Sequence, residues 1–146
     1  MNADDVRGKL DVIAANQQQL NWLRSLSPAE FAGDTRNLDS ALHRLQTTIQ
    51  ALLDIGAYVI GSLNLPTPQH SADIISELRD AGFIPPTPAD EYLRMVAFRN
   101  RVVHLYNRID PATVYEILQK HTSDLERLRD VLVDIILKHP DVSGAS

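Results

Sequence analysis

An arginine and a histidine spaced by five, Arg99 and His104, are the residues of this chain best suited to phosphate chemistry. A guanidinium keeps its positive charge at any working pH, and its fork of donors matches the oxygens of a phosphate. An imidazole can take up and release a proton near neutral pH. We therefore place the candidate site on the short stretch from Arg99 to Tyr106.

The charge around this stretch differs from that of the whole chain. The 146 residues carry a formal net charge of −5, which argues against a general nucleic-acid binder. Between Tyr92 and Ile109, however, there is no acidic residue, and four arginines occur there: Arg94, Arg99, Arg101 and Arg108. This basic segment is either a functional surface or an ordinary solvated face of a helix.

A helical projection separates the candidate residues. Tyr92, Arg99 and Tyr106 are spaced by seven and lie on one apolar stripe. A charged guanidinium in such a stripe must be paired, extend to solvent or face a wet groove. His104 lies about 140° away from Arg99, with Asn100 one turn before it. Arginine and histidine can therefore meet only through the reach of arginine, at a helix end or across a second subunit.

Apolar residues recur at the helical period along the chain, and proline-rich connections separate the periodic segments. These elements predict an all-α fold, an antiparallel bundle of four to five helices. A single domain is expected over 1–140, with a frayed tail over 141–146. The helices are expected over 3–26, from Pro28 to Asn64 with a break near Gly33–Asp34, over 72–81 after a Ser71 cap, from Thr87 to Asn107, and over 111–138.

Several kinds of site are not expected. The chain has no cysteine, which excludes disulfides, thiolate metal sites and cysteine nucleophiles. The other histidines show no spacing typical of metal ligands: His43, His70, His121 and His139. His121 lies on the inner stripe of the last predicted helix and is expected in the protein core. We therefore expect no metal and no cofactor. The absence of cysteine and of any apolar run of roughly 18 residues favours a cytoplasmic protein without a membrane segment.

The stretch from Arg99 to Tyr106 reads Arg-Asn-Arg-Val-Val-His-Leu-Tyr. It resembles the Arg-x4-His motif of HEPN domains, and in particular the Arg-x4-His-x-Tyr form of the HepT-like toxins. The chain length, the helical plan and the place of the motif on the penultimate long helix are similar to that family too. The resemblance implies a HEPN-like two-fold homodimer, in which each copy contributes its arginine and histidine to one cleft.

The function implied by this resemblance is that of a metal-independent endoribonuclease toxin of a type VII-like HEPN/MNT toxin–antitoxin pair. His104 would take the proton from an RNA 2′-hydroxyl, and Arg99 would bind the phosphate and stabilise its developing charge. Asn100 would orient the phosphate or His104. DNA, which lacks the 2′-hydroxyl, would not be cleaved. Further contacts to the RNA backbone would come from Arg94, Arg101 and Arg108.

The same resemblance implies a partner and a modification. HepT-like toxins pair with a small MntA-type nucleotidyltransferase antitoxin, which transfers AMP from ATP onto the tyrosine of the motif, here Tyr106. An added phosphate group next to Arg99 would fill the RNA site with negative charge. Without the motif, Tyr106 would be interpreted as an ordinary core tyrosine.

A second hypothesis is a non-catalytic HEPN-like helical interaction module that binds a nucleotidyltransferase partner or a nucleotide. It predicts a dimer without ribonuclease activity, and such a module has no need for both Arg99 and His104. A third hypothesis makes this chain itself the neutralising enzyme. The Gly-Ser and paired-aspartate pattern of a nucleotidyltransferase is missing from the sequence, which argues against it.

Overall fold

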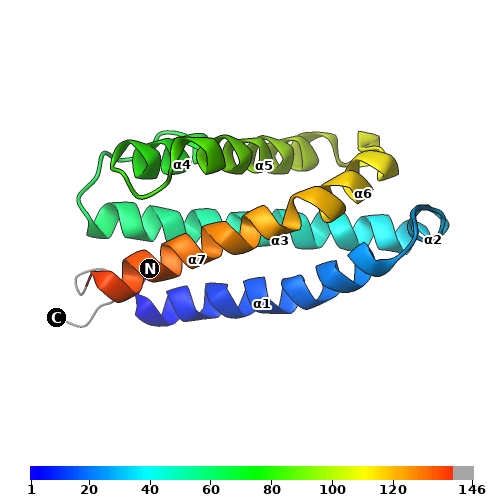
Figure 1. The fold of residues 1–146 in the computed structure, drawn as a ribbon, viewed down its shortest axis with the longest axis horizontal. Helices are drawn as coiled ribbons and strands as arrows, with labels where there is room; N and C mark the ends of the chain where they lie inside the picture. Colours follow the sequence, from blue (N-terminus) through cyan, green and yellow to red (C-terminus); the bar gives the residue numbers. More distant parts are fainter. Residues whose placement is uncertain (140–146) are drawn as a thin grey trace.

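The computed structural model describes residues 1–139, which form helices and no strand. The all-α fold expected from the sequence is therefore confirmed. Figure 1 shows the long blue and cyan helices running roughly along the long axis of the molecule. In chain order the helices are α1 (Ala3–Ser25), α2 (Pro28–Ala32), α3 (Thr35–Ser62), α4 (Ser71–Asp80), α5 (Pro86–Leu105), the 3₁₀ turn η1 (Tyr106–Arg108), α6 (Pro111–Lys120) and α7 (Thr122–Lys138).

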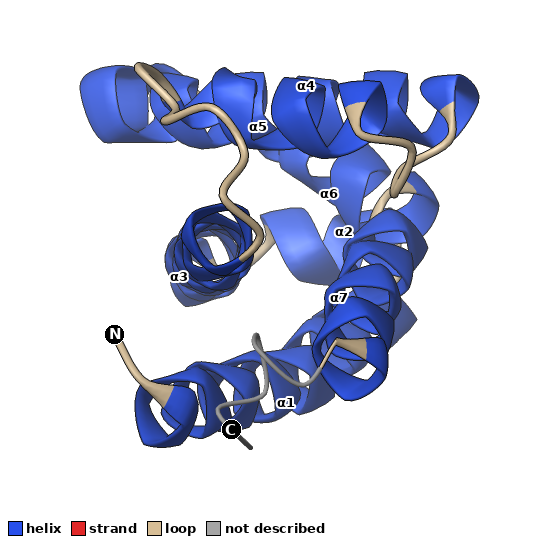
Figure 2. Ribbon diagram, turned by 90° about the vertical axis from the view of Figure 1, so that its left-hand side faces the viewer, coloured by secondary structure: helices blue, strands red, loops and turns tan. Residues whose placement is uncertain are grey.

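The long helix α3 is the centre of the fold. Helices α1, α4, α5 and α7 all pack against it, and Figure 2, which looks nearly along α3, shows them arranged around it. Burial of apolar side chains, many of them on α3, is the main favourable contribution to folding. This packing fixes α5, which carries the candidate residues, beside α3. The buried apolar residues of α3 include Leu42, Leu45, Ile49, Leu52, Ile55 and Val59.

Side chains before α2 and α3 fix where these helices begin. Ser27 and Glu30 form the predicted capping box: the Glu30 N–H donates to Ser27 Oγ at 3.1 Å, and the Ser27 N–H donates to Glu30 Oε1 at 2.9 Å. At the start of α3, the Arg36 N–H donates to Asp34 Oδ1 at 2.9 Å. The predicted break near Gly33–Asp34 is therefore confirmed.

Helix α4 approaches α3 closely because a glycine faces it. A Cβ added to Gly56 would lie 2.6 Å from Ile74 Cγ2, so a larger residue would not fit without moving α4. At the end of α4, Gly82 has a φ of +87°. The Phe83 N–H donates to the Leu78 carbonyl at 2.9 Å, as expected for a Schellman-type end.

The start of α4 differs from the expectation. Ser71 is the predicted cap, but it is the first helical residue, and His70 precedes it. The Asp73 carboxylate accepts hydrogen bonds from the backbone N–H groups of Gln69 and His70, both at 2.9 Å. An acid in the first turn, where the helix dipole favours negative charge, thus takes the place of the serine cap.

Helix α5 ends before the predicted boundary at Asn107. Leu105 has a φ of −132° and a ψ of 33°, which lie outside the helical region, and a 3₁₀ turn follows. Tyr106 therefore does not continue the apolar stripe that contains Arg99, and this part of the helical projection is wrong. Periodicity alone cannot show a change of helix type at a helix end.

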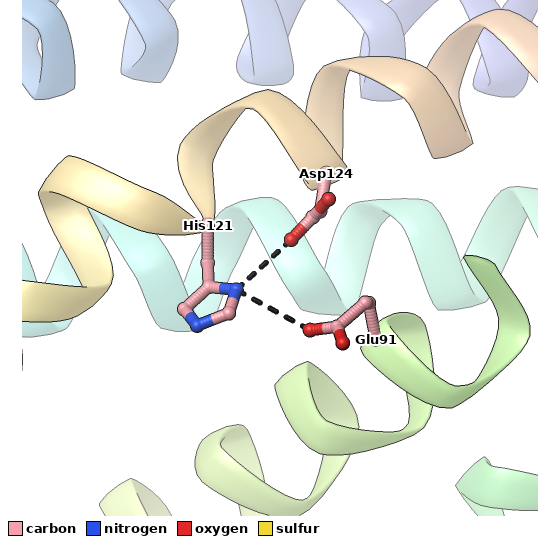
Figure 3. A group of neighbouring side chains, drawn as sticks. All are labelled: Glu91, His121 and Asp124. Carbon is pink, nitrogen blue, oxygen red and sulfur yellow. Dashed lines mark hydrogen bonds and ion pairs between the residues drawn. The ribbon is translucent and has the colours of Figure 1, made fainter. Parts of the chain in front are cut away.

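The single last helix predicted over 111–138 is two helices, α6 and α7. They meet at His121, which has a φ of −121° and a ψ of −6°. Thr122 Oγ1 donates to the Leu118 carbonyl at 3.0 Å, and the Asp124 N–H donates to the His121 carbonyl at 3.1 Å. The expectation that His121 is a core residue is also wrong, because its ring is half-buried and turned toward α5 (Figure 3).

Two further expectations concern the chain as a whole. Within residues 1–139, no helix combines the length and apolarity needed to cross a membrane. The frayed tail predicted for 141–146 lies outside the described residues, and the single domain over 1–140 stays a prediction.

Candidate functional site

Arg99 is half-buried on α5, and its charge has no ionic partner among residues 1–139. Nη1 donates to Asn100 Oδ1 at 3.0 Å, and Nη2 donates to Oε1 of Gln50 on α3. Nε is buried and makes no hydrogen bond. No carboxylate in the described part of the chain lies within ion-pair distance, 4.0 Å, of this guanidinium. Two neutral amides therefore hold Arg99 and leave its charge available to an anion.

A chain of polar contacts within the bundle orients Gln50. Its Nε2 donates to Asp54 Oδ1 at 2.8 Å, one turn further along α3. Lys9 of α1 forms an ion pair with Asp54 Oδ2 at 2.9 Å. Because only the amide nitrogen can donate to Asp54, the amide oxygen of Gln50 faces Arg99. Lys9 and Asp54 thus act on the guanidinium indirectly, through the orientation of Gln50.

Asn100 and His104 line one open groove beside α5. The groove is also lined by Ala57 of α3, by Ile74 and by Pro68–Ser71 around the start of α4. His104 is exposed and Asn100 is half-buried. Asn100 also accepts a hydrogen bond from Arg99, so the guanidinium adjoins the groove.

The arginine and histidine of the motif make no direct hydrogen bond to each other in residues 1–139. This agrees with the separation of Arg99 and His104 on the helical projection. Within one chain, Asn100 is the residue that connects the two, because it contacts Arg99 and lines the groove with His104.

Tyr106 is exposed, with 40% of its surface accessible, so the interpretation as an ordinary core tyrosine is wrong. It lines a shallow depression together with His104 and Arg108. Partial burial, and next the negative charge and hydrogen bond of Asp39 on α3, raise the pKa of the Tyr106 hydroxyl above its ordinary value of 10.0. The hydroxyl is therefore protonated at neutral pH.

The three arginines expected to contact RNA have different surroundings. Arg94 is exposed but forms an ion pair with Glu91 on its own helix. Arg101 and Arg108 are exposed, and neither pairs with an acid among the residues described. Arg108 lines the depression that His104 and Tyr106 share. The structure thus groups Arg108 with the motif and leaves Arg94 apart from it.

Neither Gln50 nor Asp54 belongs to a motif visible in the sequence. The available signal is their position, because both interrupt the apolar repeat of the central helix and are spaced by four. Residues with that spacing lie on one side of a helix and can bond to each other. A polar pair on an inward helix face needs a further partner, but the sequence does not say which.

The comparisons with known proteins identify the family of this chain. Residues 13–132 match the family described as ribonuclease HepT-like. The chain is 30% identical to the mRNA nuclease HepT of Shewanella oneidensis over 104 residues, which are 71% of this chain and 78% of that protein.

Solved structures of toxin–antitoxin complexes share the fold. A tri-AMPylated Shewanella oneidensis HEPN toxin in complex with MNT antitoxin has a TM-score of 0.81 and 27% identity, over 92% of this chain and 99% of that chain. A toxin–antitoxin structure with AMP-PNP has a TM-score of 0.79 and 26% identity, over 90% and 99% of the two chains. YutE of Bacillus subtilis, of unknown function, is 17% identical with a TM-score of 0.76, over 90% of each chain, and shows the fold alone.

The family match spans most of the chain, and it agrees with the resemblance carried by the stretch from Arg99 to Tyr106. The nuclease relative is 30% identical over 71% of this chain, and one of the structural neighbours is a HEPN toxin in complex with MNT antitoxin. This chain therefore belongs to the ribonuclease HepT-like family of HEPN toxins.

Proposed function

We propose that this chain is a metal-independent endoribonuclease toxin of a type VII-like HEPN/MNT pair. In this proposal a nucleotidyltransferase antitoxin neutralises the toxin by AMPylation of Tyr106. The toxin and its RNA substrate meet in the cytoplasm. The mRNA nuclease relative and the complexes of HEPN toxins with MNT antitoxin support both parts of the proposal.

The observation that carries the proposal is the uncompensated guanidinium of Arg99. It is half-buried, two neutral amides hold it, and its Nε is left without a partner. A structural arginine in such a position would gain stability from a carboxylate, whereas a phosphate-binding arginine is best left without one. The groove that contains Asn100 and His104 adjoins it.

The proposed cleavage uses a nucleophile that RNA itself provides. His104 takes the proton of a ribose 2′-hydroxyl, and the 2′ oxygen attacks the adjacent phosphorus. The bond to the 5′ oxygen breaks, and that oxygen takes up a proton. The products are a 2′,3′-cyclic phosphate and a free 5′-hydroxyl. Arg99 donates to the phosphate oxygens as their charge grows, and Asn100 orients the phosphate.

A second copy of the chain is part of the proposal. Arg99 and His104 lie on different sides of α5, and a two-fold axis could bring the arginine of one copy near the histidine of the other. Val103, Leu105 and Tyr106, next to the groove, are 46%, 43% and 40% exposed. A homodimer would cover this apolar surface.

Exposed arginines extend the positive surface along the RNA. Arg101 and Arg108, which have no described acidic partner, would contact backbone phosphates. Arg94 would contribute less, because its charge is already paired with Glu91. DNA would bind to the same charges but would not be cut, because it has no 2′-hydroxyl.

The proposed control acts on Tyr106. The antitoxin joins the tyrosine oxygen to the α-phosphate of ATP, the phenol proton is lost, and pyrophosphate leaves. The Shewanella toxin is tri-AMPylated, which supports transfer of more than one AMP. Negative charge added beside His104 and Arg108 would repel the RNA backbone from the shared depression.

The experiment that tests cleavage compares the wild-type chain with His104→Ala on a labelled RNA, in the presence of a chelator. We expect cleavage by the wild type and a loss of at least roughly 100-fold in the variant, the usual contribution of a general base. Circular dichroism and light scattering would show that the variant remains a folded dimer. Unchanged cleavage by a folded His104→Ala dimer would contradict the proposal, and a folded wild-type dimer that cuts no RNA would favour the non-catalytic module.

The modification is tested by intact mass and peptide mapping of toxin incubated with its antitoxin and ATP. We expect added mass in whole AMP units on Tyr106, together with loss of cleavage. Tyr58→Phe serves as a control that removes a different tyrosine hydroxyl. Modification that persists in Tyr106→Phe would contradict the assignment.

A further inference from the structure

Three potential metal ligands meet where α5 packs against the junction of α6 and α7. His121 lies at the junction, Asp124 in the first turn of α7 and Glu91 on α5. His121 Nδ1 lies 2.9 Å from Asp124 Oδ2 and 3.6 Å from Glu91 Oε2, and one donor atom of each residue lies within 4.8 Å of the other two. Figure 3 shows both carboxylates directed at the same ring nitrogen.

A hydrogen bond from His121 Nδ1 cannot satisfy both of the carboxylates that face it. A ring nitrogen carries at most one hydrogen, so Nδ1 can donate to only one of the two carboxylates. The 2.9 Å contact with Asp124 is a hydrogen bond, whereas the 3.6 Å contact with Glu91 is too long. A cation in place of the Nδ1 hydrogen could bind both oxygens and the nitrogen together.

Two arginines hold the outer oxygens of the same carboxylates. Arg94 contacts Glu91 Oε1, and Arg127 contacts Asp124 Oδ1. These contacts leave Oε2 of Glu91 and Oδ2 of Asp124 facing the histidine nitrogen. Groups that fix the orientation of ligands in this way are typical of metal sites. Asp124 is buried, and the side chains of His121 and Glu91 are 27% and 31% exposed, so an ion could enter from solvent.

We propose that Glu91, His121 and Asp124 form a divalent metal site that accepts Zn²⁺ and connects α5 to the α6–α7 junction. Tetrahedral zinc with nitrogen and oxygen ligands at about 2.1 Å has ligand atoms about 3.4 Å apart. The distances of 2.9 and 3.6 Å lie on either side of that value. One imidazole and two carboxylates suit zinc better than magnesium, which prefers oxygen ligands alone.

The role of this site is structural. It lies two helical turns before Arg99 on α5 and takes no part in the proposed cleavage. Because the two arginines offset the charge of the carboxylates, we expect weaker binding than in thiolate zinc sites. The sequence gives no metal-binding pattern because the three ligands come from two separate segments of the chain.

The test is calorimetric titration of chelator-treated, dialysed protein with zinc chloride, together with thermal unfolding. We expect one Zn²⁺ per chain, a higher melting temperature with zinc, and no effect of magnesium at the same concentration. Glu91→Gln should weaken zinc binding by roughly tenfold or more while it preserves the shape of the side chain. His121→Gln should weaken it further.

A matched control separates this site from chance binding. His43→Gln removes an exposed histidine on α3 by the same substitution and should leave zinc affinity unchanged. If His121→Gln fails to fold, the zinc affinity of Glu91→Gln alone tests the proposal. Absence of zinc binding, or equal zinc affinity in the wild type and Glu91→Gln, would overturn the proposal and leave the cluster as an ion-pair network. None of these outcomes depends on ribonuclease activity.

Discussion

The arginines in the two halves of α5 differ in whether they have an acidic partner. In the first half, Arg94 pairs with Glu91 on α5, and the neighbouring Arg127 pairs with Asp124 within α7. In the second half, Arg99 is held by the amide oxygens of Gln50 and Asn100 and has no acidic partner in residues 1–139. Arginine thus has a carboxylate counter-ion in the first half of the helix and only neutral amide partners in the second half.

Under the proposed function, this difference separates a region of α5 that is structural from the region that binds RNA. The paired arginines neutralise carboxylates that are half-buried or buried, and removing Arg127 would leave the buried Asp124 without this partner. An arginine without a counter-ion adds little to stability, but it can bind an anion without first breaking an ion pair. Comparison of the two halves therefore predicts which substitutions affect cleavage and which affect folding.

The largest effect is expected from Arg99→Ala. It should lower the cleavage rate by roughly 100-fold to 1,000-fold, the usual loss when a donor to the transition state is removed. Arg99→Lys should also be impaired, because an ammonium cannot replace the bidentate fork. Arg94→Ala, in the paired half, should lower the melting temperature only slightly, because Arg94 forms an exposed ion pair within one helix, and it should change the rate much less than Arg99→Ala. The comparison fails if the two alanine variants lose activity equally.

A smaller effect is expected from Gln50→Leu. Loss of the amide oxygen should let the guanidinium of Arg99 move, and cleavage should fall by about tenfold. The matched control is Gln46→Leu, one turn earlier on α3 and also half-buried. The single-turnover cleavage rate measures the effect. Partial recovery of this rate in Gln50→Asn would support a role of Gln50 in positioning Arg99. Equal rates in both leucine variants would show that Gln50 does not position Arg99.

Stability rather than rate should change in Gly56→Ala. The new methyl group would meet Ile74 Cγ2 at 2.6 Å, and relief of this contact should cost about 1–3 kcal/mol of unfolding free energy. Gly61→Ala lies in the same helix with no atom within 4 Å, and it should be neutral or stabilising by up to about 1 kcal/mol. Urea unfolding compares the two. A stable Gly56→Ala would mean that the α3–α4 contact is not tightly packed.

The smallest effect concerns the titration of Tyr106. Burial and Asp39 raise the pKa of its hydroxyl, so the folded chain favours the neutral phenol. The stability that the neutral Tyr106 hydroxyl contributes is present below pH 10.0, which is the ordinary pKa of tyrosine. This contribution is lost as the pH rises through the raised pKa of the folded chain. Asp39→Asn should lower the Tyr106 pKa toward that value in a spectroscopic titration. An unchanged pKa in the variant would show that Asp39 does not contact the hydroxyl.

Motifs and periodicity predict the long elements well. The apolar repeat of α3, the capping box of Ser27 and Glu30, and the glycine end of α4 at Gly82 depend on neighbouring residues only. The separation of Arg99 from His104 follows from the same local geometry. The family resemblance also rests on one continuous stretch, which is why it could be recognised without a structure.

Other features depend on contacts between distant segments. The contact of Gln50 with Arg99 joins residues 49 positions apart, and no pattern in the sequence specifies it.

Local departures from regular helix are a second kind of feature that periodicity does not record. Examples are the 3₁₀ turn at Tyr106 and the break at His121. The exposure of Tyr106 follows from the first of these departures.

The central claim is that Arg99 and His104 cleave RNA through its own 2′-hydroxyl. The most direct measurement uses mass spectrometry on the products of a defined RNA, and on the same RNA with a single 2′-deoxy nucleotide on the 5′ side of the cut. We predict a 2′,3′-cyclic phosphate and a 5′-hydroxyl from the first RNA and no cut at that position in the second. Cleavage at the deoxy position, or a product that carries a 5′-phosphate, would contradict the mechanism.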